Sequence, residues 1–309
     1  MMYLLLLLGF VLLIKGADLF VDGSASIAAL LKIPSLIIGL TIVAMGTSAP
    51  EAAVSITAGL AGNSDISLGN IVGSNIFNLL MVIGISALIR PVETAPEIKR
   101  RDLWWNVFVS IALLVTLFDR KISFLEGLIF LALMAFYLFL LIRNAKKNTA
   151  SAAVAAASLE RPAVFPSILR VLTGLTAVIL GGNLVVKNAS LIAASLGMSD
   201  TLIGLTIVAI GTSLPELATS IVAAKKGDSG IALGNAVGSC LFNILFILGA
   251  SSVLTPIHAS TELFLDTAIL IFVSIIILIF AGSRSKTSRM EGAFCILIYL
   301  CYTAYIILR

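Results

Sequence analysis

The chain alternates long apolar stretches with short polar connections along its whole length. A helix needs about 20 mostly apolar residues to cross a hydrocarbon layer of about 30 Å, and ten stretches of about this length follow one another. The pattern predicts an all-α integral membrane protein with ten transmembrane helices. The predicted spans are 2–21, 36–59, 66–89, 103–119, 122–142, 167–187, 201–224, 231–254, 263–282 and 290–308.

The composition excludes a water-soluble fold. Hydrophobic residues make up 60% of the 309 positions and charged residues only 12%, against about 45–50% and about 25% in soluble globular proteins. The lipid bilayer is therefore an expected partner. We attribute the net charge of +4 to Lys and Arg in loops and expect no nucleic-acid partner, no obligate protein partner and no cofactor.

Basic residues are distributed unevenly between the predicted loops. Loops that follow odd-numbered spans contain 15 of the 20 Lys and Arg residues, whereas the opposite face contains four. Cytoplasmic loops of membrane proteins carry an excess of Lys and Arg. We therefore expect a multi-pass protein of the plasma (inner) membrane with both termini outside the cytoplasm.

A long internal repeat is the strongest signal in the sequence. Residues 38–78 align with residues 203–243 without a gap, at a constant offset of 165 and with 27 of 41 positions identical. A weaker match sets GADLFV, residues 16–21, against GGNLVV, residues 181–186. The chain therefore consists of two related halves.

The two halves are expected to have opposite orientations in the membrane. Residues 1–142 and 167–309 each hold five predicted spans, an odd number, so the second half enters the membrane in the opposite direction from the first. The basic, Ala- and Ser-rich segment 143–166 between them is predicted to be a cytoplasmic linker. Inverted repeats are typical of secondary transporters, whose ion sites lie near the membrane midplane between the repeats.

Two acidic residues lie well inside predicted spans at equivalent repeat positions. These are Glu51 and Glu216. An ionisable group at the centre of a membrane helix costs at least about 2.5–3.5 kcal/mol on insertion scales, so a functional role is the default interpretation. The alternative is a structural acid paired with Lys or Arg, but spans 2, 3, 7 and 8 contain no basic residue.

Each glutamate directly follows the sequence G-T-S-x-P. Proline lacks a backbone N–H, and its ring clashes with the carbonyl four residues earlier, so both helices are expected to kink or unwind at Pro50 and Pro215. The freed carbonyls need partners within a membrane, and a bound cation is one of the few available. Hydroxyls three and four residues before each glutamate share its side of the helix; they belong to Thr47, Ser48, Thr212 and Ser213.

The second part of each repeat adds further oxygen atoms. Ser74 and Asn78 are spaced to share one helix face, as are Ser239 and Asn243. Oxygen ligands suit hard cations such as Ca²⁺, which takes about six to eight of them. The alternative is that these small polar residues only hold packed helices together. Their duplication beside each glutamate disfavours this alternative.

The paired G-T-S-x-P-E and G-N-x-x-G-S-x-x-F-N blocks resemble the two alpha-repeats of the sodium/calcium exchanger family, within the cation/calcium antiporter superfamily. A prokaryotic-type member is implied, which is an antiporter and not an enzyme. The resemblance implies that helices 2, 3, 7 and 8 enclose the ions while helices 1 and 6 slide against them. It implies that Ca²⁺ is bound by the carboxylates of Glu51 and Glu216 and the backbone carbonyls of Thr47 and Thr212. The implied Na⁺ sites add Ser48, Ser213, Ser74, Ser239 and the backbone carbonyls of Ala44 and Ala209, and Asn78 and Asn243 line the centre.

This chain departs from some family members at the central positions, where both residues are asparagine and both acids are glutamate. The central charge is therefore −2. A Ca²⁺/H⁺ antiporter or a K⁺-dependent Ca²⁺ antiporter remains an alternative with the same glutamates, although the serines and the lack of intramembrane histidine favour Na⁺. An intramembrane enzyme would use the paired acids as general acid and base, but no nucleophile–base pair or metal triad accompanies them. A channel is a further alternative. Inverted halves with broken helices indicate alternating access instead of a channel.

Overall fold

Helices form almost the whole of the computed structural model, which describes residues 1–155, 163–197, 209–283 and 285–308. The elements of the first half are α1 (Met2–Leu31), α2 (Ser35–Ile38), η1 (Gly39–Val43), α3 (Ala44–Thr47), α4 (Ala49–Leu60), α5 (Ser64–Phe77), η2 (Asn78–Val82), α6 (Ile83–Ile89), β1 (Val92–Glu93), η3 (Ile98–Asp102), α7 (Leu103–Thr116), η4 (Leu117–Asp119), β2 (Lys121–Ile122) and α8 (Phe124–Ala155). Those that follow are α9 (Val164–Ser195), α11 (Ala209–Thr212), α12 (Leu214–Lys226), α13 (Ser229–Phe242), η6 (Asn243–Leu248), α14 (Gly249–Leu254), β3 (Ile257–His258), α15 (Thr261–Ser283), β4 (Lys286–Thr287) and α16 (Arg289–Leu308).

The multi-pass helical membrane fold is confirmed. Eight helices of the described ranges are long and apolar enough to cross a membrane, and a ninth span is a broken one, in which the helices Ser35–Thr47 and Ala49–Leu60 meet at 49°. The remaining predicted span, 201–224, is described only from residue 209, where α11 and α12 occupy it.

Several helices extend beyond the spans that hydropathy predicts. Helix α1 runs to Leu31, although the predicted span ends at residue 21, and α8 continues to Ala155 through the first part of the segment predicted as a linker. Hydropathy marks the apolar layer, whereas a helix continues into water while its residues favour it. The structure also gives a local reason for two helix starts: Ser123 and Ser288 form capping boxes with Glu126 and Glu291, respectively.

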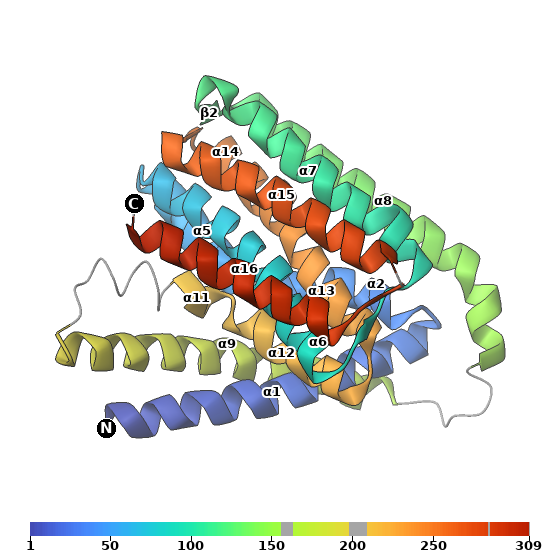
Figure 1. The fold of residues 1–309 in the computed structure, drawn as a ribbon. Coiled ribbons are helices and arrows are strands. Elements are labelled where there is room, and N and C mark those ends of the chain that lie inside the picture. The colour runs from blue at the N-terminus through green and yellow to red at the C-terminus, as the bar shows by residue number, and fades with distance from the viewer. Residues whose placement is uncertain (156–162, 198–208, 284, 309) are drawn as a thin grey trace.

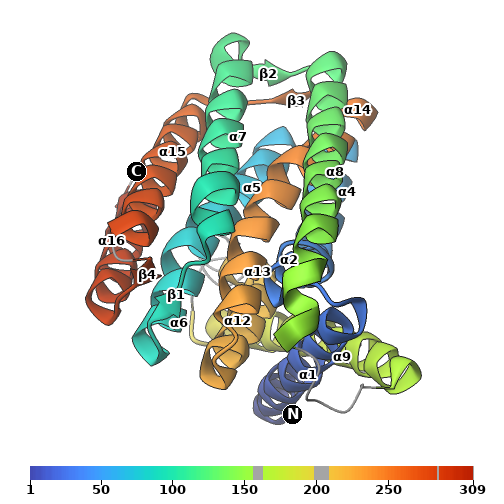
Figure 2. The ribbon, with the colours of Figure 1, turned by 90° about the vertical axis from the view of Figure 1, so that its right-hand side faces the viewer.

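Two short antiparallel ladders tie loops of the two halves together. Strand β1 pairs with β4 and β2 pairs with β3, and Figure 2 shows the β2–β3 pair and the β1–β4 pair at opposite ends of the helices. At the repeat offset of 165, the equivalent of β1 is β3 and that of β2 is β4. Equivalent loops of the two halves therefore lie at opposite ends of the molecule.

Helices α1 and α9 lie side by side along one edge of the structure, apart from the other long helices (Figure 1). Glycines allow their backbones to touch: a Cβ added at Gly16 would lie 2.9 Å from the Gly174 carbonyl oxygen, and one at Gly181 would lie 2.8 Å from that of Gly9. These pairings run in opposite directions along the chain, so the two helices are antiparallel.

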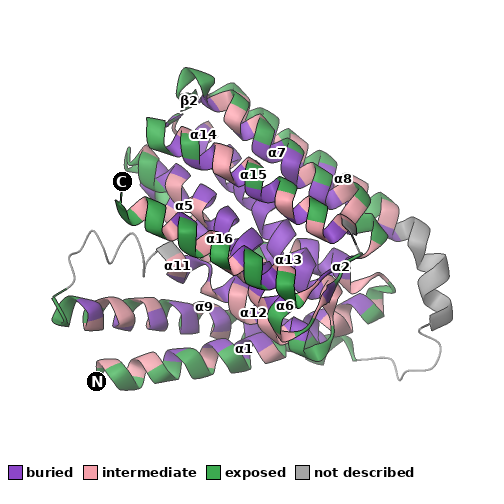
Figure 3. Cartoon of the chain, viewed as in Figure 1, coloured by how far each residue is buried: buried purple, intermediate pink, exposed green. Residues whose placement is uncertain are grey.

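The centre of the molecule is formed by the two continuous helical runs Ser64–Ile89 and Ser229–Leu254. Figure 3 shows buried residues concentrated there and exposed ones on the outer helices. In the run Ser229–Leu254, 94% of the most apolar 18-residue window is buried, against 17% for α16. The central runs thus carry polar residues out of contact with lipid, while the apolar outer helices cover them.

Candidate cation-binding site

A break in a helix places each glutamate in the centre of the molecule. Helix α3 ends at Thr47 and α4 begins at Ala49, so that Glu51 lies in the first turn of α4; Ser213 separates α11 from α12 in the same way, ahead of Glu216. The interruption predicted from Pro50 and Pro215 is therefore present in both repeats. Both glutamates are completely buried. A helix N-terminus favours negative charge, which lowers the cost of placing each carboxylate there.

Each carboxylate is held by a serine of the other repeat. Ser48 Oγ donates a hydrogen bond to Glu216 Oε1 at 2.8 Å, and Ser213 Oγ donates one to Glu51 Oε1 at 3.0 Å. Ser239 Oγ lies 3.4 Å from Glu216 Oε1 and 3.4 Å from the Ala44 carbonyl oxygen. The two repeats therefore meet directly at the two acids, and neither carboxylate is positioned by its own half alone.

A group of buried oxygen atoms in the same repeat blocks has no hydrogen-bond partner within the described part of the chain. Native structures satisfy the great majority of buried polar side-chain atoms, and a buried charge without a partner is costly. The unpartnered oxygens lie on the helices that carry the two acids and on the central runs. Such oxygens are suitable ligands for a hard cation such as Ca²⁺ or Na⁺. The atoms are Glu51 Oε2, Glu216 Oε2, Ser74 Oγ, Asn78 Oδ1 and Asn243 Oδ1.

The two threonine hydroxyls of the G-T-S-x-P motifs contact polar groups on neighbouring helices as well as the glutamates. Thr47 Oγ1 lies 3.1 Å from the Val43 carbonyl oxygen and 3.0 Å from Asn235 Oδ1. Thr212 Oγ1 donates to Asn70 Oδ1 at 3.3 Å. Helical spacing predicts these hydroxyls beside the glutamate of their own repeat, whereas the structure places Thr47 beside Glu216 and Thr212 beside Glu51, each in the opposite repeat.

The remaining predicted residues are located as follows. Ala44 is fully buried and its carbonyl oxygen accepts the backbone N–H of Ser48 at 3.0 Å. Asn78 and Asn243 each begin a π-helical turn, at equivalent repeat positions in the two central runs. Such wide turns occur frequently at functional sites. Ala209 begins α11, and its side chain lies outside the described residues.

Sequence reasoning missed two layers of polar residues behind the acids. Asn70 donates to Ser55 Oγ at 2.9 Å, and Asn235 donates to Ser220 Oγ at 3.0 Å. The second pair is the repeat copy of the first at the offset of 165, and that duplication inside membrane spans could have identified both pairs.

The second missed layer is asymmetric. Asn75 donates to the Cys240 carbonyl oxygen at 3.1 Å and accepts from Asn243 at 3.0 Å. The repeat equivalent of Asn75 is Cys240, a different residue, so the sequence carries no comparable signal there.

A cavity of about 390 Å³ lies beside both helix breaks. We call it the outer cavity, after the side of the membrane that the charge distribution of the loops predicts for this end of α9. Its lining includes Pro50 and Pro215 next to the two acids, together with Asn183 and Lys187 from α9. The cavity reaches Thr212 in the second G-T-S-x-P motif. It therefore lies against the part of the molecule that holds the carboxylates.

Comparisons with known proteins agree over nearly the whole chain. The family model described as sodium/calcium exchanger protein matches residues 1–143 and 166–308. CaxA of Alkalimonas amylolytica, described only as a candidate antiporter, is 38% identical and the alignment covers 96% of this chain and 95% of CaxA. The sodium/calcium exchanger MaX1 of Methanosarcina acetivorans is 34% identical, with 97% of each chain covered.

A solved structure of the sodium-calcium exchanger NCX_Mj superposes with a TM-score of 0.87 at 32% identity, covering 99% of this chain and 98% of that one. These relatives are named as antiporters or exchangers. The prediction of a membrane antiporter that is not an enzyme is therefore confirmed. The chain belongs to the sodium/calcium exchanger family.

Proposed function

We propose that this protein exchanges Na⁺ for Ca²⁺ across the plasma membrane by alternating access. The observation that carries the proposal is the pair of completely buried carboxylates, Glu51 and Glu216, each bound by a serine of the opposite repeat and each with one oxygen that has no hydrogen-bond partner among the described residues. Two negative charges and several neutral oxygens match one divalent cation or two monovalent ones. MaX1 and NCX_Mj, named as sodium/calcium exchangers, support the choice of ions.

The proposed architecture is ten spans in two inverted five-helix halves. Equivalent strands β1 and β3 lie at opposite ends of the helices, as do β2 and β4. Both ends of the chain lie at the same end of the molecule (Figure 1), as an even number of spans requires. With the excess of basic residues in one set of loops, this supports termini outside the cytoplasm.

The central charge also bears on stoichiometry. One Ca²⁺ or two Na⁺ neutralise two ionised glutamates, whereas a third Na⁺ has to bind to neutral oxygens such as those of Asn78 and Asn243. An exchange of three Na⁺ for one Ca²⁺ moves one net charge in each cycle. The free energy of moving this charge across the membrane is about 2.3 kcal/mol per 100 mV of membrane potential.

The choice of driving ion is tested by flux measurements on the serines. In proteoliposomes that hold only this protein, with K⁺ absent and pH clamped, a Na⁺ gradient is expected to drive ⁴⁵Ca²⁺ uptake. Ser74→Ala and Ser239→Ala are expected to raise the Na⁺ concentration needed for half-maximal exchange by about five- to 150-fold, because loss of one buried ligand costs about 1–3 kcal/mol. The apparent Ca²⁺ affinity should change less, since Ca²⁺ depends mainly on the carboxylates.

A matched control is Ser288→Ala, a serine that caps α16 and takes no part in the candidate site. Its Na⁺ dependence should equal that of the wild type. If a pH gradient drove Ca²⁺ uptake equally well without Na⁺, a Ca²⁺/H⁺ antiporter would replace the proposal. Uptake that required added K⁺ would instead indicate a K⁺-dependent exchanger.

Membrane topology gives an independent prediction. In a background without Cys240, Cys295 and Cys301, single cysteines are introduced as Lys147→Cys, Lys226→Cys and His258→Cys. The first two should react with an impermeant thiol reagent only from the cytoplasm, and the third only from outside, because of the charge difference between the loops. Labelling of the Lys147 and His258 positions from the same side would contradict the inverted arrangement.

A further inference from the structure

The outer cavity has a positive charge at its lining. Lys187 is an exposed residue of α9 and the only titratable residue among those that line this cavity in the described part of the chain. Asn183 lies one helical turn earlier on the same helix and lines the same cavity. A cation that approaches the carboxylates through the outer cavity therefore passes a lysine.

The repeat locates the corresponding surface at the other end of the molecule. At the offset of 165, the equivalents of Asn183 and Lys187 are Asp18 and Asp22 on α1. On this part of α1 the apolar residues next to the two aspartates are packed against neighbouring helices. Ala17 is fully buried, Val21 is 1% exposed, and Leu214 packs against the adjacent apolar cluster. The surface that is open beside α9 is thus closed beside α1.

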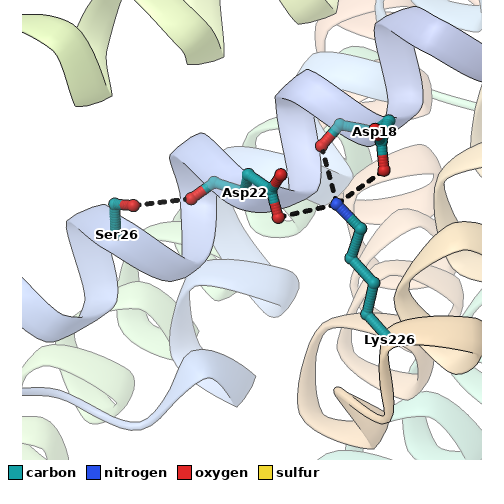
Figure 4. A network of polar contacts seen from close by, with 4 residues as sticks. All are labelled: Asp18, Asp22, Ser26 and Lys226. Atoms are coloured by element: carbon teal, nitrogen blue, oxygen red, sulfur yellow. Dashed lines mark hydrogen bonds and ion pairs between the residues drawn. The ribbon is translucent and has the colours of Figure 1, made fainter.

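A lysine bridges this closed surface (Figure 4). Lys226, the last residue of α12, places its Nζ 2.6 Å from an oxygen of Asp18 and 2.6 Å from an oxygen of Asp22, and it also donates to the Asp18 backbone carbonyl. Partial burial lowers the pKa of the Lys226 amine, but the hydrogen bonds that it donates to Asp18 and Asp22 outweigh the effect of burial and raise the pKa above its ordinary value. The two aspartates are about half exposed, at 49% and 51%. An ion pair this accessible to water contributes little stability and is easily released.

We propose that the two mouths of the transport pathway carry opposite fixed charges and thereby give the protein a different apparent Ca²⁺ affinity on each side. Asp18 and Asp22 attract Ca²⁺ at the cytoplasmic mouth once Lys226 leaves them, whereas Lys187 repels Ca²⁺ at the outer mouth. The inference rests on the proposed function, and it adds a bias towards taking Ca²⁺ up from the cytoplasm and releasing it outside.

The physical basis is the valence of the ions. A fixed charge acts on Ca²⁺ with twice the energy with which it acts on Na⁺ at the same place. Any change that it causes in the apparent affinity for Ca²⁺ is therefore the square of the change for a single Na⁺. Both effects weaken as salt is added, because the mouths are in contact with solvent.

The outer mouth is tested with Lys187→Gln. The apparent KM for Ca²⁺ is measured at each face separately, in right-side-out and inside-out vesicles, at low and at high ionic strength. We expect the outer KM to fall by about two- to tenfold at low ionic strength, the cytoplasmic KM to stay unchanged and the difference to disappear in high salt. The matched control is Lys121→Gln, which removes an exposed charge of β2, on the same face but outside the cavity lining.

The cytoplasmic mouth is tested with Asp22→Asn and Lys226→Gln. The control is Glu97→Gln, which removes an exposed acidic charge that takes no part in the ion pair of Lys226. If the aspartates attract Ca²⁺, Asp22→Asn raises the cytoplasmic KM and Lys226→Gln lowers it, because the second substitution exposes both acids. If the ion pair acts only as a latch, both substitutions break it and shift the cytoplasmic KM in the same direction. Shifts in the same direction, or an outer KM unaffected by Lys187→Gln, would overturn the inference.

The wild-type measurement separates this inference from the proposed function. Absence of Na⁺-driven Ca²⁺ flux in the wild type would contradict Na⁺/Ca²⁺ exchange itself. Normal wild-type exchange with unaltered KM values in the variants would contradict only the opposite charges of the two mouths.

Discussion

Replacing Glu51 or Glu216 by glutamine is expected to abolish Ca²⁺ transport while the protein still inserts and folds. Each substitution removes one of the two charges that neutralise a divalent cation, in a buried site where charges interact far more strongly than in water. A neutral amide costs less to bury than a carboxylate, so folding should not suffer. The measurement is ⁴⁵Ca²⁺ uptake by proteoliposomes, with the thermal unfolding midpoint recorded for the same preparations.

The chain offers a matched pair of controls for this experiment. Glu126 and Glu291 are also separated by 165 residues and also lie in the first turn of a helix, where they cap the N-termini of α8 and α16. Glu126→Gln and Glu291→Gln keep the capping interaction and should retain Ca²⁺ uptake. Near-wild-type uptake by Glu51→Gln and Glu216→Gln would rule out the assignment of the two acids as ion ligands.

The double substitution Gly174→Ala and Gly181→Ala is expected to destabilise the protein strongly. The added Cβ atoms would lie 2.5 Å from the Phe20 backbone nitrogen and 2.7 Å from that of Leu13. Backbone atoms cannot turn away as a side chain can, so α1 has to move. Overpacking costs about 1–3 kcal/mol at one site, and the two sites are far enough apart for their costs to add approximately. Thermal unfolding in detergent micelles measures the loss.

The neighbouring residue Gly182 provides the control on the same helix. A Cβ there meets nothing closer than 3.5 Å, a side-chain atom of Pro215. Alanine favours a helix over glycine by about 1 kcal/mol, so Gly182→Ala should leave the unfolding temperature unchanged or raise it. Equal destabilisation by Gly182→Ala and by the double substitution would show that close contact between α1 and α9 is not the cause.

Much of this molecule could be predicted from the sequence because a membrane limits the possible structures. Apolar length alone locates most of the spans, and the cost of an intramembrane charge singles out Glu51 and Glu216. Proline chemistry predicts the break ahead of each glutamate, which the structure shows at Ser48 and Ser213. These features depend on local sequence and on the solvent, so no partner has to be known.

The partners of each residue could not be predicted in the same way. The offset of 165 states which residues are equivalent, and equivalence is not contact: Ser48 binds the glutamate of the other repeat, not its own. Helical spacing predicts the Thr47 hydroxyl beside Glu51 of its own repeat, whereas the structure places it next to Asn235 on α13 and Glu216 of the other repeat. The link between Asn75 and Cys240 depends on the packing of the two central runs, which a linear sequence does not specify.

The glycine contacts between α1 and α9 have a mechanical consequence. Two helices whose backbones touch at several levels are expected to move as one rigid body. This rigid body borders both mouths, because α9 lies beside the outer cavity and α1 carries the aspartates that Lys226 bridges. A rigid body that shifts towards one mouth moves away from the other. Under the alternating access proposed above, the same displacement that uncovers the carboxylates on one side would cover them on the other, which would keep the two sides of the membrane separated throughout the transport cycle.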